Sequence, residues 1–255
     1  MIIDSHVHLP TPDYPEGGRE IRGTEAAIDR LRRSGTDAAI FNTWRGVYAA
    51  KPEDVESANR AALRIAKRHE EFLYPGAVLS PFCHEKSVEW LARFRDRGLL
   101  WVGELLPRSK PDCAYMDAPY LRLFEACARG GHIVQLHGTP QLPDLARRFP
   151  EMQIVRSHIG TNDENRALAA LPNTWVDVSG QRGGLWMGGM EGAAKTFGPD
   201  RMLYGTDFSG YVPECFMIRV KQTLPSTADR RKVFSANVLR LLRKAGAELG
   251  KWPGK

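Results

Sequence analysis

The sequence predicts an α/β protein of the (β/α)8 barrel type, the TIM barrel, built as a single domain over residues 1–255. Eight short segments rich in Val, Ile, Leu and aromatic residues recur along the chain, and stretches with helical spacing of apolar residues separate them. Strands that alternate with helices in this way form a parallel sheet. Eight such units use nearly all of the 255 residues, which favours a closed barrel over an open sheet, and no change in composition marks a second domain.

Several of the expected strands are short apolar runs, as is usual for parallel strands covered by helices. They comprise residues 2–8, 37–43, 72–79, 99–105, 132–137, 153–158, 174–179 and 201–207. Helices are expected over residues 24–34, 54–70, 85–97, 117–129 and 228–249, the last being the longest. Two loops are expected after strands: residues 10–22, with three prolines, and residues 180–192, a mobile loop with six glycines and apolar anchors. Such loops form the catalytic face of a barrel.

The composition excludes several classes of protein. A hydrophobic fraction of 42% with 26% charged residues is typical of a globular protein rather than a disordered one. No apolar run approaches the roughly 18 residues that span a membrane, and the N-terminus lacks the pattern of a signal peptide. Four widely spaced cysteines without a Cys-x-x-Cys pair indicate reduced thiols, so we expect a cytoplasmic protein. The net charge of +6 is attributed mainly to an outer helix surface, with attraction to an anionic partner as the alternative.

Side chains able to bind metal or move protons fall near the ends of five different expected strands. His6 and His8 are two residues apart on the first strand, so both point to the same face, where two imidazoles can chelate one divalent cation. Each such residue also has a structural interpretation, as a core histidine, a helix cap or an ion-pair partner. Their combined placement favours a site, whereas His69, His84 and His132 have positions typical of structural residues. The site candidates are His6, His8, Glu104, His137, His158 and Asp207.

An ordered set of short segments carries a resemblance to a known family. The segments are IDSHVH at residues 3–8, QLHG at 135–138, RFP at 148–150, IVRSHIG at 154–160, LPNTWVDVSG at 171–180, GPDRMLYGTD at 198–207 and ANVLRLL at 236–242. Each piece alone is weak, but the ordered set is specific and spans nearly the whole chain. It resembles the amidohydrolase superfamily, and within it the amidohydrolase-related branch. That branch includes aminocarboxymuconate semialdehyde decarboxylase-like enzymes and dicarboxylate lactonases.

The resemblance implies a divalent metal, usually zinc, at the end of the barrel. The implied ligands are His6, His8 and His137, with Asp207 at or beside the metal. His158 is then the residue that polarises the substrate or moves a proton. A set of imidazoles with a carboxylate and an open position is typical of a catalytic metal site rather than a closed structural one.

The chain departs from the family pattern at two points. Many relatives with two metals use a carboxylated lysine on the fourth strand, but residues 101–105 here contain no lysine. Glu104 is the candidate that replaces it as a ligand or bridge, so one zinc is favoured and a second remains an alternative. Asp207 is followed by Phe208 where many relatives have proline, which affects the loop more than the chemistry. Some relatives, notably lactonases, keep these polar residues and work without metal.

The leading functional expectation is a metal-dependent hydrolase of a small amide, ester or lactone. A water activated by the metal attacks the carbonyl carbon, and Asp207 takes the proton of that water. His158 helps the metal to stabilise the oxyanion. The alternative in the same fold is a metal-dependent decarboxylase of a small unsaturated or aromatic carboxylic acid. A TatD-like nuclease, which shares the His-x-His start and a Gly-Glu like Gly103-Glu104, is less favoured. A binding module without activity is disfavoured by the complete set of polar residues.

Positive and aromatic residues on the loops are candidates for substrate binding. Arg45, just past the second strand, is a candidate clamp for a carboxylate, with an ordinary surface arginine as the alternative. Arg108 and Arg182 are further candidates on later loops, and Trp44 and Trp186 are candidate apolar walls. We therefore expect a small-molecule substrate, anionic if these arginines bind it. Neither a membrane nor a nucleic acid is an expected partner, and a homo-oligomer remains open.

Overall fold

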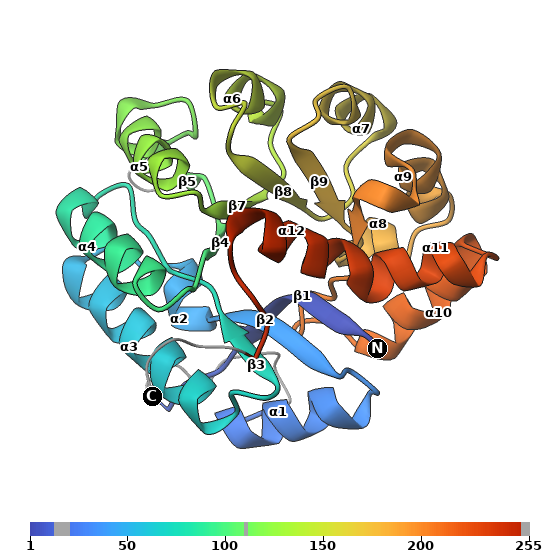
Figure 1. Ribbon diagram of the computed structural model, residues 1–255, viewed down its shortest axis with the longest axis horizontal. Coiled ribbons are helices and arrows are strands. Elements are labelled where there is room, and N and C mark those ends of the chain that lie inside the picture. The colour runs from blue at the N-terminus through green and yellow to red at the C-terminus, as the bar shows by residue number, and fades with distance from the viewer. Residues whose placement is uncertain (13–20, 110–111, 251–255) are drawn as a thin grey trace.

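The computed structural model describes residues 1–12, 21–109 and 112–250, and its parallel strands form a barrel surrounded by helices (Figure 1). Around the barrel the strands are β1 (Ile3–Leu9), β2 (Ala38–Thr43), β3 (Leu73–Pro75), β4 (Trp101–Leu105), β7 (Ile133–His137), β8 (Gln153–Ser157), β9 (Thr174–Asp177) and β10 (Met202–Leu203). They form two parallel sheets, β1-β2-β3 and β10-β9-β8-β7-β4. Backbone contacts join both seams: Ala77 pairs with Val102, and the Ser5 amide donates to the Tyr204 carbonyl at 2.9 Å. The predicted (β/α)8 barrel is confirmed.

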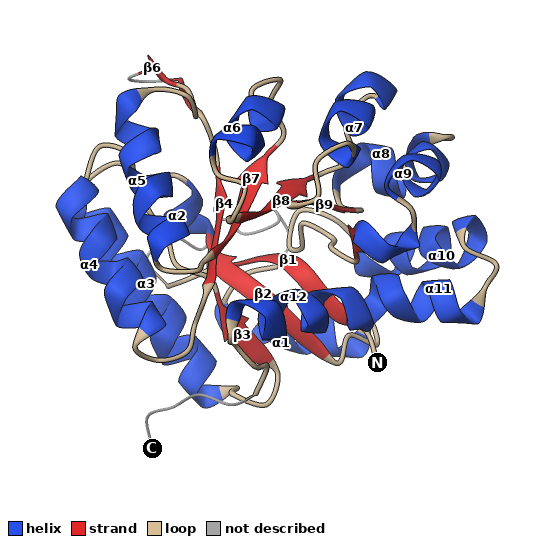
Figure 2. Cartoon of the chain, turned by 45° about the horizontal axis from the view of Figure 1, so that its top comes forward, coloured by secondary structure: helices blue, strands red, loops and turns tan. Residues whose placement is uncertain are grey.

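Helical segments follow every barrel strand and pack around the outside (Figure 2). The first half contains α1 (Thr24–Arg33), α2 (Trp44–Val47), α3 (Pro52–Arg68), α4 (His84–Arg95) and α5 (Ala118–Arg129). The second half contains α6 (Leu142–Arg148), α7 (Asn162–Ala169), α8 (Gly180–Gly184), α9 (Gly189–Phe197), η1 (Pro199–Arg201), α10 (Pro213–Thr223), α11 (Thr227–Arg231), η2 (Lys232–Ala236) and α12 (Asn237–Ala245). A short antiparallel pair, β5 (Arg108–Ser109) and β6 (Asp112–Cys113), lies between β4 and α5.

The core lies between the barrel and the ring of helices. Strands β8 and β9 are buried along their whole length, which explains why apolar and polar residues do not alternate along them. The helices bury one stripe each; α3, for example, buries Val55, Ala62 and Ile65 at helical spacing. A bidentate ion pair between Arg30 of α1 and Glu214 of α10, with both contacts at 2.8 Å, ties the first and last parts of the ring together.

The expectation of a loop over residues 180–192 is wrong, because α8 lies within this segment and α9 begins in it. The glycines there permit close packing: a Cβ on Gly183 would lie 1.6 Å from the carbonyl oxygen of Val178. The apolar residues expected to be anchors face outward instead, since Trp186 is 49% exposed and Met187 is 89% exposed. Glycine content therefore misled the prediction, because it reflects steric space and not flexibility.

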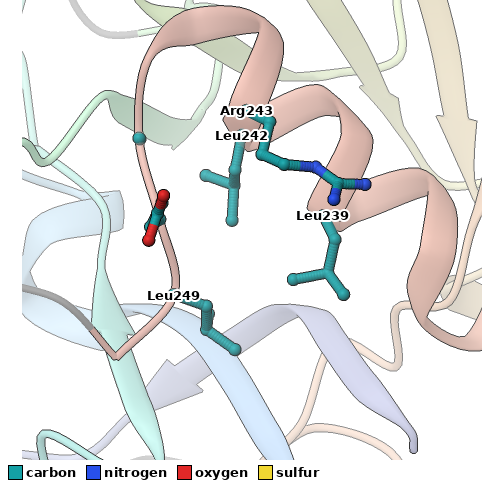
Figure 3. A pocket seen from close by; sticks show the side chains of 6 residues that line it. Leu239, Leu242, Arg243 and Leu249 are labelled. Carbon is teal, nitrogen blue, oxygen red and sulfur yellow. The ribbon is translucent and has the colours of Figure 1, made fainter.

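The expected helix over residues 228–249 is also altered. The helical run starts at Thr227, passes through the π-helical turn η2, and ends at Ala245, before the left-handed Gly246. Its last part, α12, lies over the amino ends of the strands, where the Asn237 side chain donates to the carbonyl of Met202 at 2.8 Å. A pocket of about 250 Å³ beside α12 (Figure 3) therefore lies at the end of the barrel away from the carboxyl ends of the strands.

Two expectations about the chain as a whole concern the membrane and the cysteines. Among the described residues, no helix is both long and apolar enough to cross a bilayer. All four cysteines lie in the described ranges, and each has a free thiol. A cytoplasmic location stays a prediction.

Candidate active site

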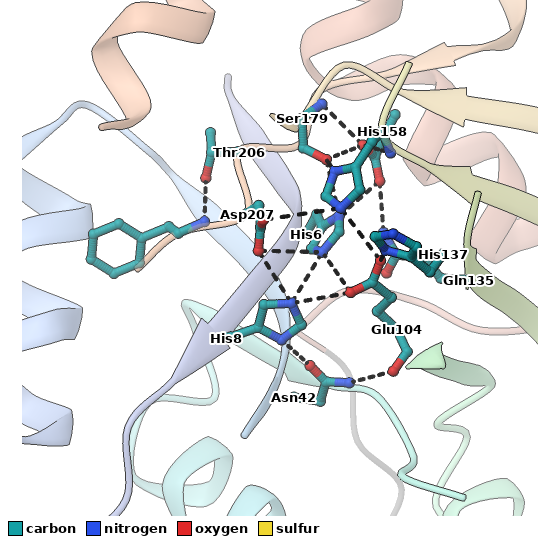
Figure 4. Close-up of polar contacts among 12 residues, drawn as sticks. His6, His8, Asn42, Glu104, Gln135, His137, His158, Ser179, Thr206 and Asp207 are labelled. Atoms are coloured by element: carbon teal, nitrogen blue, oxygen red, sulfur yellow. Dashed lines mark hydrogen bonds and ion pairs between the residues drawn. The ribbon is translucent and has the colours of Figure 1, made fainter. Parts of the chain in front are cut away.

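The structure gathers the predicted polar side chains at the carboxyl ends of the barrel strands (Figure 4). His6 and His8 lie on β1 and are each 1% exposed, and Glu104, near the end of β4, is 5% exposed. His158 follows β8 directly. Asp207 follows β10 and is the more open of the two carboxylates, with 16% of its side chain exposed. Residues more than 200 positions apart in sequence thus meet at one end of the barrel.

The hydrogen bonds of His6 and His8 fix which nitrogen of each ring carries a proton. The Nδ1 atom of His6 lies 2.9 Å from Oδ2 of Asp177, and Nδ1 of His8 lies 2.7 Å from Oδ1 of Asn42. Both partners are acceptors, so each Nδ1 must be the donor. The two Nε2 atoms lie 3.1 Å apart. Two lone pairs at that separation repel unless a cation, either a metal ion or a proton, lies between them.

Two carboxylates complete the surroundings of the paired imidazoles. Oε2 of Glu104 lies 3.5 Å from Nε2 of both His6 and His8. Oδ1 of Asp207 lies 3.3 Å from Nε2 of His8 and 3.7 Å from Nε2 of His6. Ligand atoms about 2.1 Å from a metal stand about 3.0 Å apart in octahedral and about 3.4 Å apart in tetrahedral geometry. The donor set and its spacing therefore fit a divalent cation.

His158 and His137 lie on the other side of Glu104. Nε2 of His158 is 3.6 Å from Oε1 of Glu104 and 4.0 Å from Oδ2 of Asp207. Of the described residues, two sets are close enough to hold an ion: His6, His8 and Asp207, or His6, Glu104 and His158. His137 belongs to neither set; its Nδ1 donates to Oε1 of Glu104 at 3.0 Å, and its side chain is 42% exposed. Its assignment as a metal ligand stays a prediction.

The sequence analysis missed polar residues that hold the histidines in place. Asp177, at the end of β9, is fully buried, and its carboxylate accepts from His6 and from Nε2 of Gln135, each at 2.9 Å. Ser179 lies between Asp177 and Nδ1 of His158, with its Oγ 2.7 Å from that nitrogen. A usable signal was present, because a charged residue at the carboxyl end of an apolar strand is the feature that singled out Asp207. The missed residues are Asn42, Gln135, Asp177 and Ser179.

Burial and neighbouring charges shift the pKa values of several groups in the site. Burial opposes protonation of His6, but the carboxylates of Asp177 and Glu104 offset it and raise the pKa of His6. Burial also opposes the charge of Asp177, yet the His6 cation and the hydrogen bonds from His6 and Ser179 lower the pKa of Asp177 to about 2. Burial and repulsion by His6 lower the pKa of His158. The metal-free site thus holds a positive charge at His6, in the place that a cation would take.

The backbone is strained at two of the predicted site residues. His158 and Asp207 have φ angles of 63° and 58°, the left-handed conformation that residues other than glycine rarely adopt. The amide of His158 donates to Oδ1 of Asp177 at 3.1 Å, and its carbonyl accepts from Nε of Arg156 at 3.0 Å. The amide of Asp207 donates to the carbonyl of His6 at 2.9 Å. These contacts hold both residues in an unfavourable conformation that orients their side chains.

Two of the predicted substrate-binding arginines have protein partners. Arg45, in α2, forms an ion pair with Asp54 at 3.1 Å. Arg108 donates from its two terminal nitrogens to the carbonyls of Val47 and Ala49, at 2.9 and 3.0 Å. Arg108 thereby ties the segment after β4 to the segment after β2. Roles in substrate binding stay predictions for both arginines.

The third arginine contacts an exposed tryptophan, whereas the other tryptophan packs against a histidine of the site. The guanidinium of Arg182 lies over the exposed ring of Trp186, 4.7 Å from its centre, as in a cation–π contact. Trp44 packs its ring 4.7 Å from the ring of His8, and its indole nitrogen donates to Oγ of Ser209 at 3.1 Å. Of the two tryptophans, Trp44 is therefore the one that lies against the side chains with the spacing of metal ligands. These side chains, the metal-competent group, are His6, His8, Glu104 and Asp207.

Comparison with known proteins identifies the family. The family model described as amidohydrolase matches residues 3–244 of the chain. The chain therefore belongs to the amidohydrolase family of enzymes, as the resemblance in its sequence implied. A search among curated proteins finds no match.

Solved structures with the same fold include decarboxylases and a hydrolase. The 2,6-dihydroxybenzoate decarboxylase from Rhizobium is 14% identical with a TM-score of 0.73, covering 95% of this chain and 98% of its own. The dihydroxybenzoic acid decarboxylase from Polaromonas, with bound manganese and 2-nitroresorcinol, is 16% identical with a TM-score of 0.72, covering 95% and 96%. The probable 2-pyrone-4,6-dicarboxylic acid hydrolase from Acinetobacter baumannii, with bound citric acid, is 15% identical with a TM-score of 0.66, covering 95% and 99%.

Proposed function

We propose that this chain is a divalent-metal-dependent decarboxylase of a small aromatic or unsaturated carboxylic acid. The observation that carries the proposal is the facing pair of Nε2 atoms of His6 and His8, 3.1 Å apart, with the carboxylates of Glu104 and Asp207 beside them. Decarboxylation is favoured over hydrolysis because several structures with the same fold are decarboxylases of hydroxybenzoates, one with manganese bound. This ranking reverses the leading expectation from the sequence, in which hydrolysis came first.

The residues that would hold the metal are His6, His8, Glu104 and Asp207, with His137 as the further ligand that the resemblance implies. Imidazole donors suit zinc, and carboxylate donors suit manganese, so this mixed set is compatible with either ion. When bound, the metal supplies a Lewis acid that polarises a substrate oxygen and draws electron density from the bond to the departing carboxylate.

The chain's own residues supply the proton chemistry. In decarboxylation the carbon–carbon bond to the carboxylate breaks, carbon dioxide leaves, and a proton joins the carbon left behind. Asp207, the more exposed carboxylate, is positioned to deliver that proton, and Nε2 of His158 lies 4.0 Å from its Oδ2 to exchange a proton with it. The ring of Trp44 against His8 offers a flat apolar surface for an aromatic substrate.

Hydrolysis of an ester or lactone is the second candidate function. The same carboxylate and imidazole groups can assist attack of water on a carbonyl carbon, and the hydrolase from Acinetobacter baumannii has the same fold. The name of that probable hydrolase includes a dicarboxylic acid, so an anionic small molecule is the expected substrate for both candidate functions. The nuclease alternative loses its support with membership of the amidohydrolase family.

A direct assay separates these candidates. Purified protein loaded with zinc or manganese is incubated with a panel of hydroxybenzoic and unsaturated acids, and with a panel of lactones and esters. We expect release of carbon dioxide from at least one acid, with one solvent deuteron in the product when the reaction runs in D2O. The His8→Ala variant and chelator-treated protein are the controls and should be inactive. Hydrolysis of a lactone without carbon dioxide release from any acid would overturn the proposal in favour of the second candidate.

A further inference from the structure

We propose that Asp177 is a positioning residue that fixes the protonated nitrogen of two histidines at once, His6 directly and His158 through the hydroxyl of Ser179. The inference rests on the proposed function in one respect, since it takes His6 to be a metal ligand. Asp177 lies on β9, and its partners come from β1, from β7 and from the segments that follow β8 and β9. It predicts separate consequences for metal binding and for proton transfer.

Five donors surround the Asp177 carboxylate, which is 0% exposed. Oδ2 accepts from Nδ1 of His6 and Nε2 of Gln135, each at 2.9 Å. Oδ1 accepts from the backbone amides of His158 and Ser179, at 3.1 and 3.0 Å, and from the Ser179 hydroxyl. A carboxylate saturated by donors only accepts, so Nδ1 of His6 has to carry a proton and Nε2 has to face the metal-competent group.

Asp177 acts on the His158 ring through the hydroxyl of Ser179. The hydroxyl proton of Ser179 goes to Asp177, so its oxygen is an acceptor. This oxygen is 3.2 Å from Nδ1 of His6, which lies closer to Asp177, and 2.7 Å from Nδ1 of His158. That nitrogen therefore carries the proton, and Nε2 of His158 presents a lone pair toward Glu104 and Asp207. His158 thus begins with a free acceptor on the side of the site, so it must take up a proton from water there before it can pass one to Asp207.

The two paired histidines differ in what stands behind them. His6 has a carboxylate at Nδ1, whereas His8 has the neutral amide oxygen of Asn42. A carboxylate partner makes an imidazole a stronger donor to a metal, and loss of such an outer partner typically costs about 10- to 100-fold in metal affinity. His6 is therefore the ligand whose strength depends most on a residue outside the metal-competent group.

The test compares Asp177→Asn with Ser179→Ala. The control is Thr174→Val, which removes a buried hydroxyl bond to the carbonyl of Leu168 at the far end of β9 without changing side-chain shape. Affinity for Zn²⁺ or Mn²⁺ alone is measured by competition with a chelating dye. Ring tautomers are read in the metal-free protein by 1H–15N NMR with 15N-labelled histidine, at a pH high enough for His6 to have lost its extra proton.

We expect Asp177→Asn to lower metal affinity by about 10- to 100-fold and to change the ring signals of both His6 and His158. Ser179→Ala should change the His158 signal and leave metal affinity within about threefold of wild type and Thr174→Val. Equal effects of Asp177→Asn and Thr174→Val would overturn the inference, as would a loss of affinity in Ser179→Ala as large as that in Asp177→Asn. Neither readout needs a substrate. If wild type bound no metal, the proposed function would fail, while the metal-free NMR spectra would still decide whether Asp177 sets both tautomers.

Discussion

The buried carboxyl group of Asp4 makes stability depend on pH in a way that can be measured. Asp4 lies on β1 and is 0% exposed. Its oxygens accept from the backbone amides of His6 and Thr206, both at 3.1 Å, and from the Thr206 hydroxyl at 2.5 Å. Burial outweighs these hydrogen bonds and raises the pKa of Asp4 from 3.8 to about 7. The folded protein therefore holds this proton more tightly than the unfolded chain does.

The expected effect follows from that difference in pKa. The stabilising contribution of protonated Asp4 is complete below pH 3.8 and is lost as the pH rises through about 7. The difference between the folded and unfolded values corresponds to about 4 kcal/mol of unfolding free energy. Asp4→Asn removes the titration and keeps an amide oxygen that can accept from the Thr206 hydroxyl, as the carboxyl oxygen does. The variant should therefore gain about 4 kcal/mol relative to wild type between pH 4 and pH 8.

Urea unfolding followed by tryptophan fluorescence, at several pH values and with a chelator present, measures this difference without interference from metal. The control is Asp163→Asn, whose native side chain is 88% exposed and which should follow wild type at every pH. A free-energy difference between Asp4→Asn and wild type that stays constant from pH 4 to pH 8 would refute the reasoning. It would mean that the donors around Asp4 keep it ionised in the folded state.

Further predictions concern the proposed metal ligands, the ion pair between α1 and α10, and Trp44. His8→Ala should lower metal affinity by more than the roughly 100-fold that loss of an outer partner costs, as measured by dye competition. Because the pKa of His6 is raised, metal must displace a proton there, so affinity should fall as the pH is lowered, and calorimetry in buffers of different ionisation heat should detect proton release. Arg30→Ala should lower unfolding free energy by less than about 1 kcal/mol, because the pair with Glu214 is partly exposed. Trp44→Ala should raise KM more than it lowers kcat in steady-state assays, because its ring offers binding surface rather than proton transfer.

The sequence was sufficient to predict the barrel because short segments rich in Val, Ile, Leu and aromatic residues alternate with stretches of helical spacing. His6 and His8 could be predicted as partners for a local reason, since residues two apart on a strand share a face. Asp177 could not be paired with His6 in the same way, because 171 residues separate them and only closure of the barrel brings them together.

For Arg108, the sequence predicted the position but not the binding partners. Arg108 was placed on the correct face of the barrel, but its terminal nitrogens bind the carbonyls of Val47 and Ala49, which a one-dimensional pattern does not reveal. Residues 180–192 were misjudged for a related reason: whether glycine marks flexibility or tight packing depends on a neighbour such as the carbonyl of Val178. The pattern of residues in the sequence does not show contacts with backbone atoms that are distant in sequence.

The left-handed backbones of His158 and Asp207 bear on how this protein can evolve. Glycine would relax either position, so loss of the functional side chain is offset by roughly 1 kcal/mol of relieved strain. A lineage released from the need for catalysis would lose these two residues early, since drift and selection for stability act in the same direction there. Persistence of a histidine and an aspartate at these positions among diverging relatives would therefore be a sensitive sign that the chemistry is still under selection.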